Sequence, residues 1–388
     1  MTTTGNTKKR KKKIRERIMI AVSILLIIVS ILGVIFVVIW NSKPFNKQKG
    51  EVYNFKDNSN YIDDVFVSNE NQINFLIVGV DVSESLSDVI LVASVDVKKK
   101  SIEVLQIPRD SYVAQTSTGK INSIYSFKGK DYKDLKPIER TKKIIYEQFQ
   151  IPIDYYAVFT LDSFKKTVDA MGGIPISLPN SLDIENGTIL PAGPQVLNGD
   201  KAEMFVRHRH SYLEADIGRV KAQRIFLAAA VEQMKKQGLA KITTNIIPQI
   251  AGSITSNMAV KDMANFAKLF ASIDMANIRI HMIPGQATTI NSQSVYAIHA
   301  DETAKLLNEY FRPYSDDVGV EKLKINRVIH TGDWYENTDD TFNELIDGVK
   351  PGQKNVDSSS SATTTTKTST KSVTTTKTTN KATTTTKK

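Results

Sequence analysis

Apolar runs of strand length alternate with amphipathic stretches through the middle of the chain. The run INFLIVGV at 73–80 is followed by Asp81 and a Ser-rich turn, which predicts a buried strand. The same criteria predict further strands at 88–97, 101–108, 155–161, 174–179 and 278–284. Helical periodicity predicts helices at 142–149, 162–171, 217–237, 260–272 and 302–312.

The order of these elements predicts the fold class. Strands that alternate with helices and are mostly apolar on both faces are typical of an α/β sheet covered on both sides. The lysines at 98–100 form a turn between two successive strands, so the sheet is expected to be mixed rather than purely parallel. Gly172 and Gly173 indicate a backbone turn with positive φ. We therefore expect an α/β domain with a mixed central sheet and helices on both sides, preceded by one transmembrane helix.

The start of the chain has the pattern of a membrane anchor. Residues 1–17 carry eight basic side chains against Glu16, and residues 18–40 carry no charge and are rich in Ile, Val and Leu. A helix of that length would span roughly 34 Å, which is enough to cross a bilayer. The basic arm predicts a cytoplasmic N-terminus, with Trp40 at the opposite interface and the rest of the chain outside the cytoplasm. A cleaved signal peptide is the alternative, but no small-residue cleavage motif follows the run.

Composition divides the remainder of the chain. Residues 41–70 are polar and are expected to form a stalk, and residues 71–315 contain the predicted strands and helices of one domain. Residues 316–356 are a C-terminal extension. Residues 357–388 are almost entirely Ser, Thr and Lys and are expected to be disordered. This tail is expected either to associate weakly with anionic polymers or to act as an inert spacer.

The net charge of +10 is concentrated at the two ends of the chain. Residues 1–17 carry +7 and residues 357–388 carry +5, which leaves −2 for residues 18–356. The folded domain is therefore nearly neutral, and we predict no nucleic-acid partner. The absence of cysteine excludes disulfides, thiolate metal ligands and a cysteine nucleophile, so the domain must depend on its hydrophobic core.

Arginines gather in the segment MFVRHRHSYLEADIGRVKAQ at 204–223. Arg207, Arg209 and Arg219 lie within it, and Gln223 ends it one helical turn after Arg219. Guanidinium groups that converge on one place need an anion, because like charges repel at close range. Their planar forks suit phosphate oxygens, which they bind in pairs. The segment therefore predicts a phosphate-binding site.

An earlier part of the chain supplies acids that complete such a site. Asp81 and Asp88 follow or begin predicted strands, and Arg109 follows a third. Arginines together with paired carboxylates suggest a phosphate ligand with a bridging divalent metal, which is the composition of a phosphoryl-transfer site. Capping of turns is the alternative role for the two aspartates. Lys120 and Asn122 are expected either to reach substrate phosphate or sugar, or only to close a loop.

Seven sequence blocks carry a resemblance to a known family. They are, in order, NFLIVGVD, SDVILVASVD, IPRDSYV, KINSIYS, IPIDYYAVFTLDSFKKTVDAMGGIPISLP, LPAGPQVLNGDKAEMFVRHR and DIGRVKAQRIFLAA. In this order and spacing, over residues 71–312, the chain resembles the LytR–CpsA–Psr family of envelope glycopolymer ligases. A single N-terminal span with a short cytoplasmic arm is also usual for that family.

The resemblance implies a function and partners. Members of the family move a glycopolymer phosphate from a polyprenyl-pyrophosphate carrier onto peptidoglycan, with assistance from Mg²⁺. The expected partners are therefore a polyprenyl-pyrophosphate-linked glycan donor, a peptidoglycan acceptor and membrane lipid. The resemblance leaves the polymer open among wall teichoic acid, capsular polysaccharide and other wall glycans. The lipid tail would need an apolar groove, which periodicity alone does not identify.

The resemblance also implies roles for individual residues. Asp81 and Asp88 match the metal-associated acids, and with Arg109 they are the expected catalytic residues. The expected substrate-binding residues are Arg207, Arg209, Arg219 and Gln223, with Lys120 and Asn122 as further candidates. An acid near the metal, Asp81 or Asp110, is expected to orient or deprotonate the acceptor hydroxyl. The alternative for Asp110, and the favoured one, is a structural role in which it holds Arg109 in place.

The chain departs from the family pattern at several positions, among them Tyr112 and Val113, where some members carry a basic residue. Leu86 and Ala222 stand where members often have arginine, although Arg224 follows shortly after Ala222. Fewer cations would weaken phosphate binding or indicate a different substrate. The alternative function is therefore a non-catalytic protein that binds polyprenyl pyrophosphate or serves as a cell-wall assembly scaffold. Transcriptional regulation is disfavoured, because the short cytoplasmic arm cannot hold a helix-turn-helix.

Overall fold

The computed structural model describes residues 71–83, 85–116, 118–184, 188–208, 216–314, 316–326 and 339–347. The predicted basic arm, transmembrane helix, stalk and Ser/Thr/Lys-rich tail lie outside the described residues. Within the described ranges, no helix is both long enough and apolar enough to cross a membrane.

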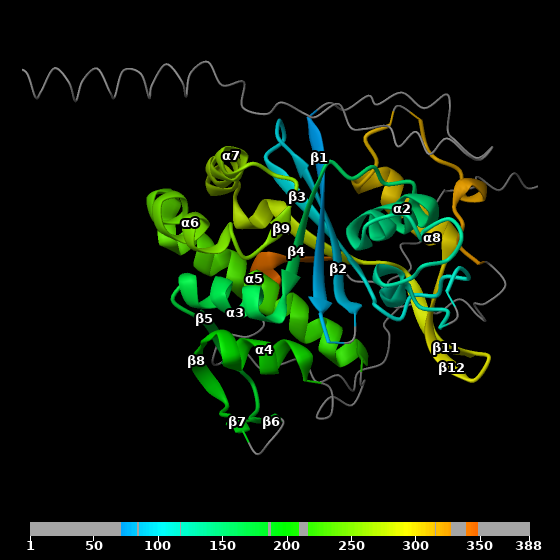
Figure 1. Cartoon of the computed structure of the whole chain (residues 1–388). Helices are drawn as coiled ribbons and strands as arrows, with labels where there is room; N and C mark the ends of the chain where they lie inside the picture. The colour runs from blue at the N-terminus through cyan, green and yellow to red at the C-terminus, as the bar shows by residue number, and fades with distance from the viewer. Residues whose placement is uncertain are drawn as a thin grey trace, which may run out of the picture. The chain divides into compact units, whose positions relative to one another are not determined.

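A mixed sheet forms the centre of the domain (Figure 1). Among the described residues it has seven strands in the order β13-β10-β3-β2-β1-β4-β9. They are β1 (Gln72–Asp81), β2 (Leu86–Asp96), β3 (Ser101–Ile107), β4 (Tyr155–Thr160), β9 (Thr255–Ser256), β10 (Ile278–Met282) and β13 (Asp339–Thr341). Strands β1, β2 and β3 pair antiparallel in succession, whereas β4 runs parallel to β1 and β10 parallel to β3. The predicted mixed sheet is confirmed.

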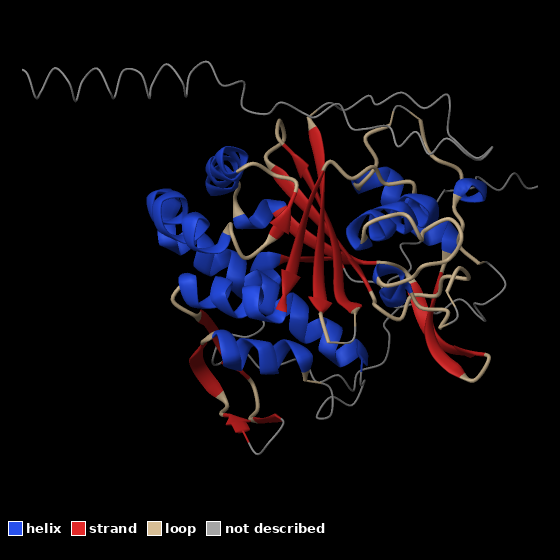
Figure 2. Cartoon of the chain, viewed as in Figure 1, coloured by secondary structure: helices blue, strands red, loops and turns tan. Residues whose placement is uncertain are grey.

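Helices cover both faces of this sheet (Figure 2). They are α2 (Pro137–Phe149), α3 (Leu161–Ala170), α4 (Gly199–Arg207), α5 (Asp216–Lys241), α6 (Ile247–Ile250), α7 (Val260–Ser272), α8 (Ala300–Tyr310) and α9 (Phe342–Asp347). Shorter helical turns are η1 (Ile121–Tyr125), η3 (Ile242–Ile246), η4 (Met275–Asn277) and η5 (Val320–Lys322).

Alternation along β1 divides the core into two layers. Leu76 and Val78 pack in one cluster with side chains of α2 and α8, whereas Phe75 and Ile77 pack in another with side chains of α5, α7 and α9. Successive strand residues point to opposite faces, so a run that is apolar at every position satisfies both layers. This explains why the predicted strands are almost continuously apolar.

A smaller layer lies beside the main sheet. Strand β5 (Ile174–Leu178) pairs with β8 (Gly193–Leu197) and packs with α3, α4 and α5 around a third cluster. The predicted turn before β5 has positive φ at both Gly172 and Gly173. A Cβ at Gly173 would lie 2.6 Å from a methyl carbon of Val196, so a larger residue does not fit there.

Most predicted elements are present, and the differences are local. The helix predicted from Lys142 begins at Pro137, because proline is favourable in a first helical turn. Helix α5 extends to Lys241 across a non-helical Gly238. The elements that were not predicted include helices α4, α6 and α9 and strands β8, β9 and β13. Two hairpins were not predicted either: β6 (Leu182–Ile184) with β7 (Thr188–Leu190), and β11 (Gly285–Ile290) with β12 (Gln293–Ile298).

Arg312 joins the ends of two helices in the core. Its Nε and Nη2 donate hydrogen bonds to the carbonyl oxygen of Phe149 at 3.0 and 2.6 Å, and its Nη1 donates to Oδ1 of Asn308. Burial lowers the pKa of Arg312 to about 10, although Tyr314 and Asp317 act in the opposite direction. The guanidinium therefore ties the end of α2 to the end of α8.

Replacing Arg312 by alanine is expected to lower the free energy of unfolding by about 3 kcal/mol, because the buried Phe149 carbonyl loses charged donors. Urea unfolding of the full chain in detergent, followed by circular dichroism, measures this change. The matched control is Lys322→Ala, at an exposed position of η5, which should stay within about 0.5 kcal/mol of wild type. A similarly small change for Arg312→Ala would contradict the role given to it.

Candidate functional site

A β-bulge places Asp88 at the end of the sheet. Gly79 pairs with Val89 and Val80 pairs with Ser87, so Asp88 is an extra residue between two paired positions. A bulge redirects the side chain of the extra residue and is frequent beside functional sites. Gly79 faces this point, where a Cβ would lie only 3.2 Å from Cβ of Val89. The local backbone thus turns Asp88 out of the regular alternation of β2.

Asp81 ends β1 next to this bulge. Its side chain is nearly buried, and its Oδ1 accepts hydrogen bonds from the backbone N of Ser83 at 2.9 Å and from the Ser83 hydroxyl. Its Oδ2 lies 3.6 Å from Nη2 of Arg207. One oxygen therefore fixes the turn after β1, as the capping alternative expected, while the other faces an arginine of the predicted phosphate site.

Arg109 follows β3 and pairs with Asp88. Its Nη1 lies 2.6 Å from Oδ1 of Asp88, and its backbone oxygen accepts a hydrogen bond from the backbone N of Asn122 at 3.1 Å. Asp110 lies 3.2 Å from Nζ of Lys120 and 3.7 Å from Nε of Arg109. Asp110 is therefore placed to hold the Arg109 loop.

Lys120 and Asn122 lie behind this loop. The backbone oxygen of Asn122 accepts a hydrogen bond from the Ser87 hydroxyl at 3.2 Å, so η1 is tied both to β2 and to the Arg109 loop. Neither Lys120 nor Asn122 is among the residues that line the cavity described below. Their contacts in this structure are those of the loop-closing alternative, and direct substrate contact stays a prediction.

Arg207 is the last residue of α4 and is about half exposed. Its Nη1 donates to Oε1 of Glu203, one turn earlier, at 2.9 Å. Burial opposes the charge of Arg207, but the hydrogen bond to Glu203 and the negative charges of Glu203, Asp81 and Asp88 raise its pKa. The guanidinium is thus held by acids on two sides, Glu203 and Asp81.

Helix α5 supplies two more of the predicted residues. Arg219 and Gln223 are one turn apart, so they share a helix face, and Arg219 is 3% exposed. Gln223 donates a hydrogen bond from Nε2 to the backbone oxygen of Val206 at 3.2 Å. Its Oε1 accepts one from Nε2 of the buried Gln106 at 3.4 Å. This chain of amides joins β3, α5 and the end of α4, next to Arg207.

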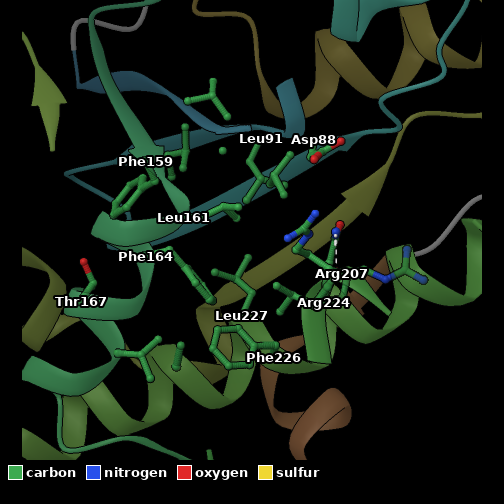
Figure 3. Close-up of a pocket in the computed structure, with 18 of the residues that line it drawn as sticks. Asp88, Leu91, Phe159, Leu161, Phe164, Thr167, Arg207, Arg224, Phe226 and Leu227 are labelled. Atoms are coloured by element: carbon green, nitrogen blue, oxygen red, sulfur yellow. Dashed lines mark hydrogen bonds between the residues drawn. The ribbon is translucent and has the colours of Figure 1, made fainter. Parts of the chain in front are cut away.

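A cavity of about 400 Å³ lies between the sheet, α3 and α5, and several of the residues described above line it (Figure 3). In Figure 3, Asp88, Arg207 and Arg224 lie toward one end of the cavity, and Phe159, Phe164 and Thr167 lie toward the other. The charged or amide lining residues are Asp81, Asp88, Gln106, Arg207, Arg219, Gln223 and Arg224. Most other lining residues are apolar, among them Ile77, Val89, Leu91, Leu161, Phe226, Leu227, Ala230 and Ile280.

The structure brings most of the predicted site together and adds one residue. Five predicted site residues line the cavity: Asp81, Asp88, Arg207, Arg219 and Gln223. Arg109 does not line it but pairs with Asp88, which does. Arg209 lies outside the described residues. Arg224 was not predicted to belong to the site. In the sequence, Arg224 is marked only as a cation directly before the apolar run IFLAAAV. Ala222, in contrast, is buried in the cluster beside α3 and α4.

The acids of the cavity are few for a metal site. Among the described residues, no group of three or more His, Cys, Asp or Glu could hold one. Asp81 and Asp88 nevertheless line the same cavity. Mg²⁺ is commonly bound through one or two carboxylates, with phosphate oxygens and water completing the shell. Two aspartates in a cavity that arginines also line therefore fit Mg²⁺ bound together with a phosphate ligand, and do not form a metal cage on their own.

Comparison with known proteins shows the family of this chain. The model of the LytR_cpsA_psr family matches residues 38–312, and the chain belongs to this family. A relative from Bacillus subtilis (strain 168), the polyisoprenyl-teichoic acid–peptidoglycan teichoic acid transferase TagV, is 28% identical over 229 residues, which are 56% of this chain and 56% of TagV. The transferase of the same description named TagU, from Halalkalibacterium halodurans, is 29% identical over 252 residues, 63% of this chain and 79% of TagU.

Solved structures share the fold. The crystal structure of B. subtilis TagV is 26% identical with a TM-score of 0.52, and the match covers 62% of this chain and 97% of that one. The structure of TagT bound to LIIa-WTA is 20% identical with a TM-score of 0.51, covering 64% and 93%. The second likeness concerns the fold alone. The mixed sheet with its helices is thus the architecture of this family.

Proposed function

We propose that the chain is a membrane-anchored phosphotransferase that attaches a glycopolymer from a polyprenyl-pyrophosphate carrier to peptidoglycan. The observation that carries this proposal is a cavity with arginines and aspartates toward one end and apolar side chains toward the other. A lipid pyrophosphate has the same division between a charged head and an apolar tail. The names of the TagU and TagV relatives favour teichoic acid as the polymer.

The reaction needs charge neutralisation more than a covalent nucleophile. Attack by an acceptor hydroxyl on the glycan-bearing phosphorus forms a phosphodiester, breaks the bond to the lipid-side phosphate, and releases polyprenyl phosphate and a proton. Arg207 and Arg219 line the cavity, and Arg109 pairs with Asp88, which also lines it. These arginines would bind the phosphate oxygens, whose charge must be spread as this bond breaks. Mg²⁺ held by Asp81 and Asp88 would supply further positive charge to the same oxygens.

The ion pairs of the site keep its arginines in place before substrate binds. Asp88 holds Arg109 at 2.6 Å, and Glu203 holds Arg207 at 2.9 Å. Positioned donors lose little orientational freedom when phosphate arrives, which favours tight binding in the transition state. Apolar lining beside the charged groups limits water around the breaking bond, and so strengthens each electrostatic contact.

The same proposal includes the location of the protein. The basic arm at 1–17 and the uncharged segment at 18–40 support a single span with a cytoplasmic N-terminus. The domain would then face the outer side of the membrane, where lipid-linked glycans and peptidoglycan meet. The lipid tail of the carrier would enter the cavity from this same membrane.

Transfer is expected to depend on a divalent metal. The full chain in detergent is incubated with a polyprenyl-pyrophosphate glycan and peptidoglycan fragments, and mass spectrometry detects the phosphodiester-linked product. We expect product in the presence of Mg²⁺ and a rate of transfer at least about 100-fold lower with EDTA. The rate should recover when excess Mg²⁺ is restored. Asp88→Asn should lower the rate even with Mg²⁺ present. Donor that is bound but neither transferred nor hydrolysed would instead support the non-catalytic scaffold.

A further inference from the structure

Arg224 is a buried cation in the wall of the cavity. It is 3% exposed, lies on α5 and lines the cavity together with Arg219 and Gln223. Its Nη1 lies 3.8 Å from the sulfur of Met282 on β10, so the side chain crosses from the helix to the sheet. Thioether sulfur is a weak acceptor compared with a phosphate oxygen.

The order of side chains along α5 gives Arg224 a particular place. Arg219 and Gln223 line the cavity first, Arg224 comes next, and Leu227 and Ala230 follow. With a rise of about 1.5 Å per residue, Arg224 lies about 7.5 Å farther along the helix axis than Arg219. In Figure 3 it lies near Arg207 on one side and Leu227 on the other. Arg224 is therefore at the boundary between the charged and apolar parts of the cavity.

We propose that Arg224 binds the lipid-side phosphate of the polyprenyl-pyrophosphate donor. The inference rests on the proposed function. A donor whose tail lies along Leu227 and Ala230 has its tail-linked phosphate at this boundary, and the glycan-bearing phosphate farther toward Asp81 and Asp88. Arg109 and Arg207 would then serve the transferred phosphate, and Arg224 the phosphate that remains on the lipid.

The position of Arg224 beside the lipid-side phosphate gives it a role in the reaction. When the bond between the two phosphates breaks, its electron pair stays on the bridging oxygen of the lipid-side phosphate, which leaves as polyprenyl phosphate with more negative charge. A guanidinium remains protonated even when buried and offers two parallel donors to phosphate oxygens. Arg224 would therefore stabilise the leaving group as well as bind the donor.

The test compares two ligands that differ only in the phosphate. The affinities of the full chain in detergent are measured for a polyprenyl monophosphate and for the polyprenol of equal chain length. We expect Arg224→Gln to weaken binding of the monophosphate by about 10- to 100-fold and to leave polyprenol binding unchanged. The matched control is Lys236→Gln, which removes a cation of α5 that pairs with Glu232 on the surface and should change neither affinity.

Other outcomes have a defined meaning. Equal weakening for both ligands would show a structural role for Arg224, and unchanged binding of both would show no phosphate contact; either result overturns the proposal. If Arg224→Gln does not fold, Arg224→Lys carries the test, because it keeps the charge but loses the fork. The monophosphate-to-polyprenol affinity ratio should then fall several-fold, and an unchanged ratio overturns the proposal.

Kinetics add a second readout. With donor saturating, kcat of Arg224→Gln should fall by at least about 10-fold, because leaving-group charge is greatest in the transition state. Absence of any transfer by the wild-type chain would count against the proposed function. The affinity ratio would still decide whether Arg224 binds lipid phosphate.

Discussion

Arg109→Ala should lower kcat/KM for glycopolymer transfer by about 1,000-fold. Arg109 combines two features that make the loss large: its guanidinium lies 2.6 Å from Asp88, and its loop is held by Asp110 and by η1. A fixed arginine acts on the phosphate oxygens without having to be ordered during the reaction. The measurement is the initial rate of phosphodiester formation by the full chain, with mass-spectrometric detection.

The control must separate lost chemistry from lost structure. Removing Arg109 leaves Asp88 without the cation that faces it at 2.6 Å, which by itself destabilises a partly buried acid. The double variant Arg109→Ala/Asp88→Asn removes that charge and should recover thermal stability. Because Asp88→Asn lowers the rate by itself, the activity of the double variant is compared with that of Asp88→Asn alone, and should be lower. Arg279→Ala, an arginine of β10 over the Tyr310 ring, should keep normal activity. Equal transfer by the double variant and by Asp88→Asn alone would show that Arg109 only stabilises the fold.

The strands were predictable because each satisfies two layers of core. The run at β1 is apolar at almost every position, since alternate residues contact helices on opposite sides of the sheet. The charged part of the site was also predictable, because Asp81 ends β1, Asp88 lies near the start of β2 and Arg109 follows β3 by two residues, so all three are near strand ends. Short strands outside the sheet, such as β6 and β7, have too few residues for periodicity to detect.

The apolar half of the cavity was not predictable from local pattern. Its lining comes from β2, α3 and α5, where Leu91, Phe164 and Leu227 have the spacing of ordinary core residues. Whether such a side chain meets another side chain or an open cavity depends on how the layers pack, which no single segment encodes. Arg224 is hidden for the same reason, because its place is defined only when α5 lies against β10.

Filling the apolar half should separate lipid binding from phosphate chemistry. Ala230 lines the cavity from α5, beyond Leu227, and Ala230→Trp places a large ring where the lipid tail is proposed to lie. Excluding three or four methylene groups of tail costs about 3 kcal/mol, or roughly 100-fold in affinity. We therefore expect KM for a long-chain donor to rise by about 100-fold, while kcat changes little. Initial rates across donor concentrations give both constants.

Donor length and a matched variant make this expectation specific. A donor with a single short prenyl unit does not extend to Ala230, so KM for this donor should be the same for Ala230→Trp as for wild type. Ala240→Trp makes the same substitution at an exposed position of α5 and should affect neither donor. Ala230→Leu should give an intermediate KM, because a smaller side chain excludes less of the tail. Equal losses for short and long donors would mean that the ring disturbs the phosphate site, and that the lipid tail does not occupy this cavity.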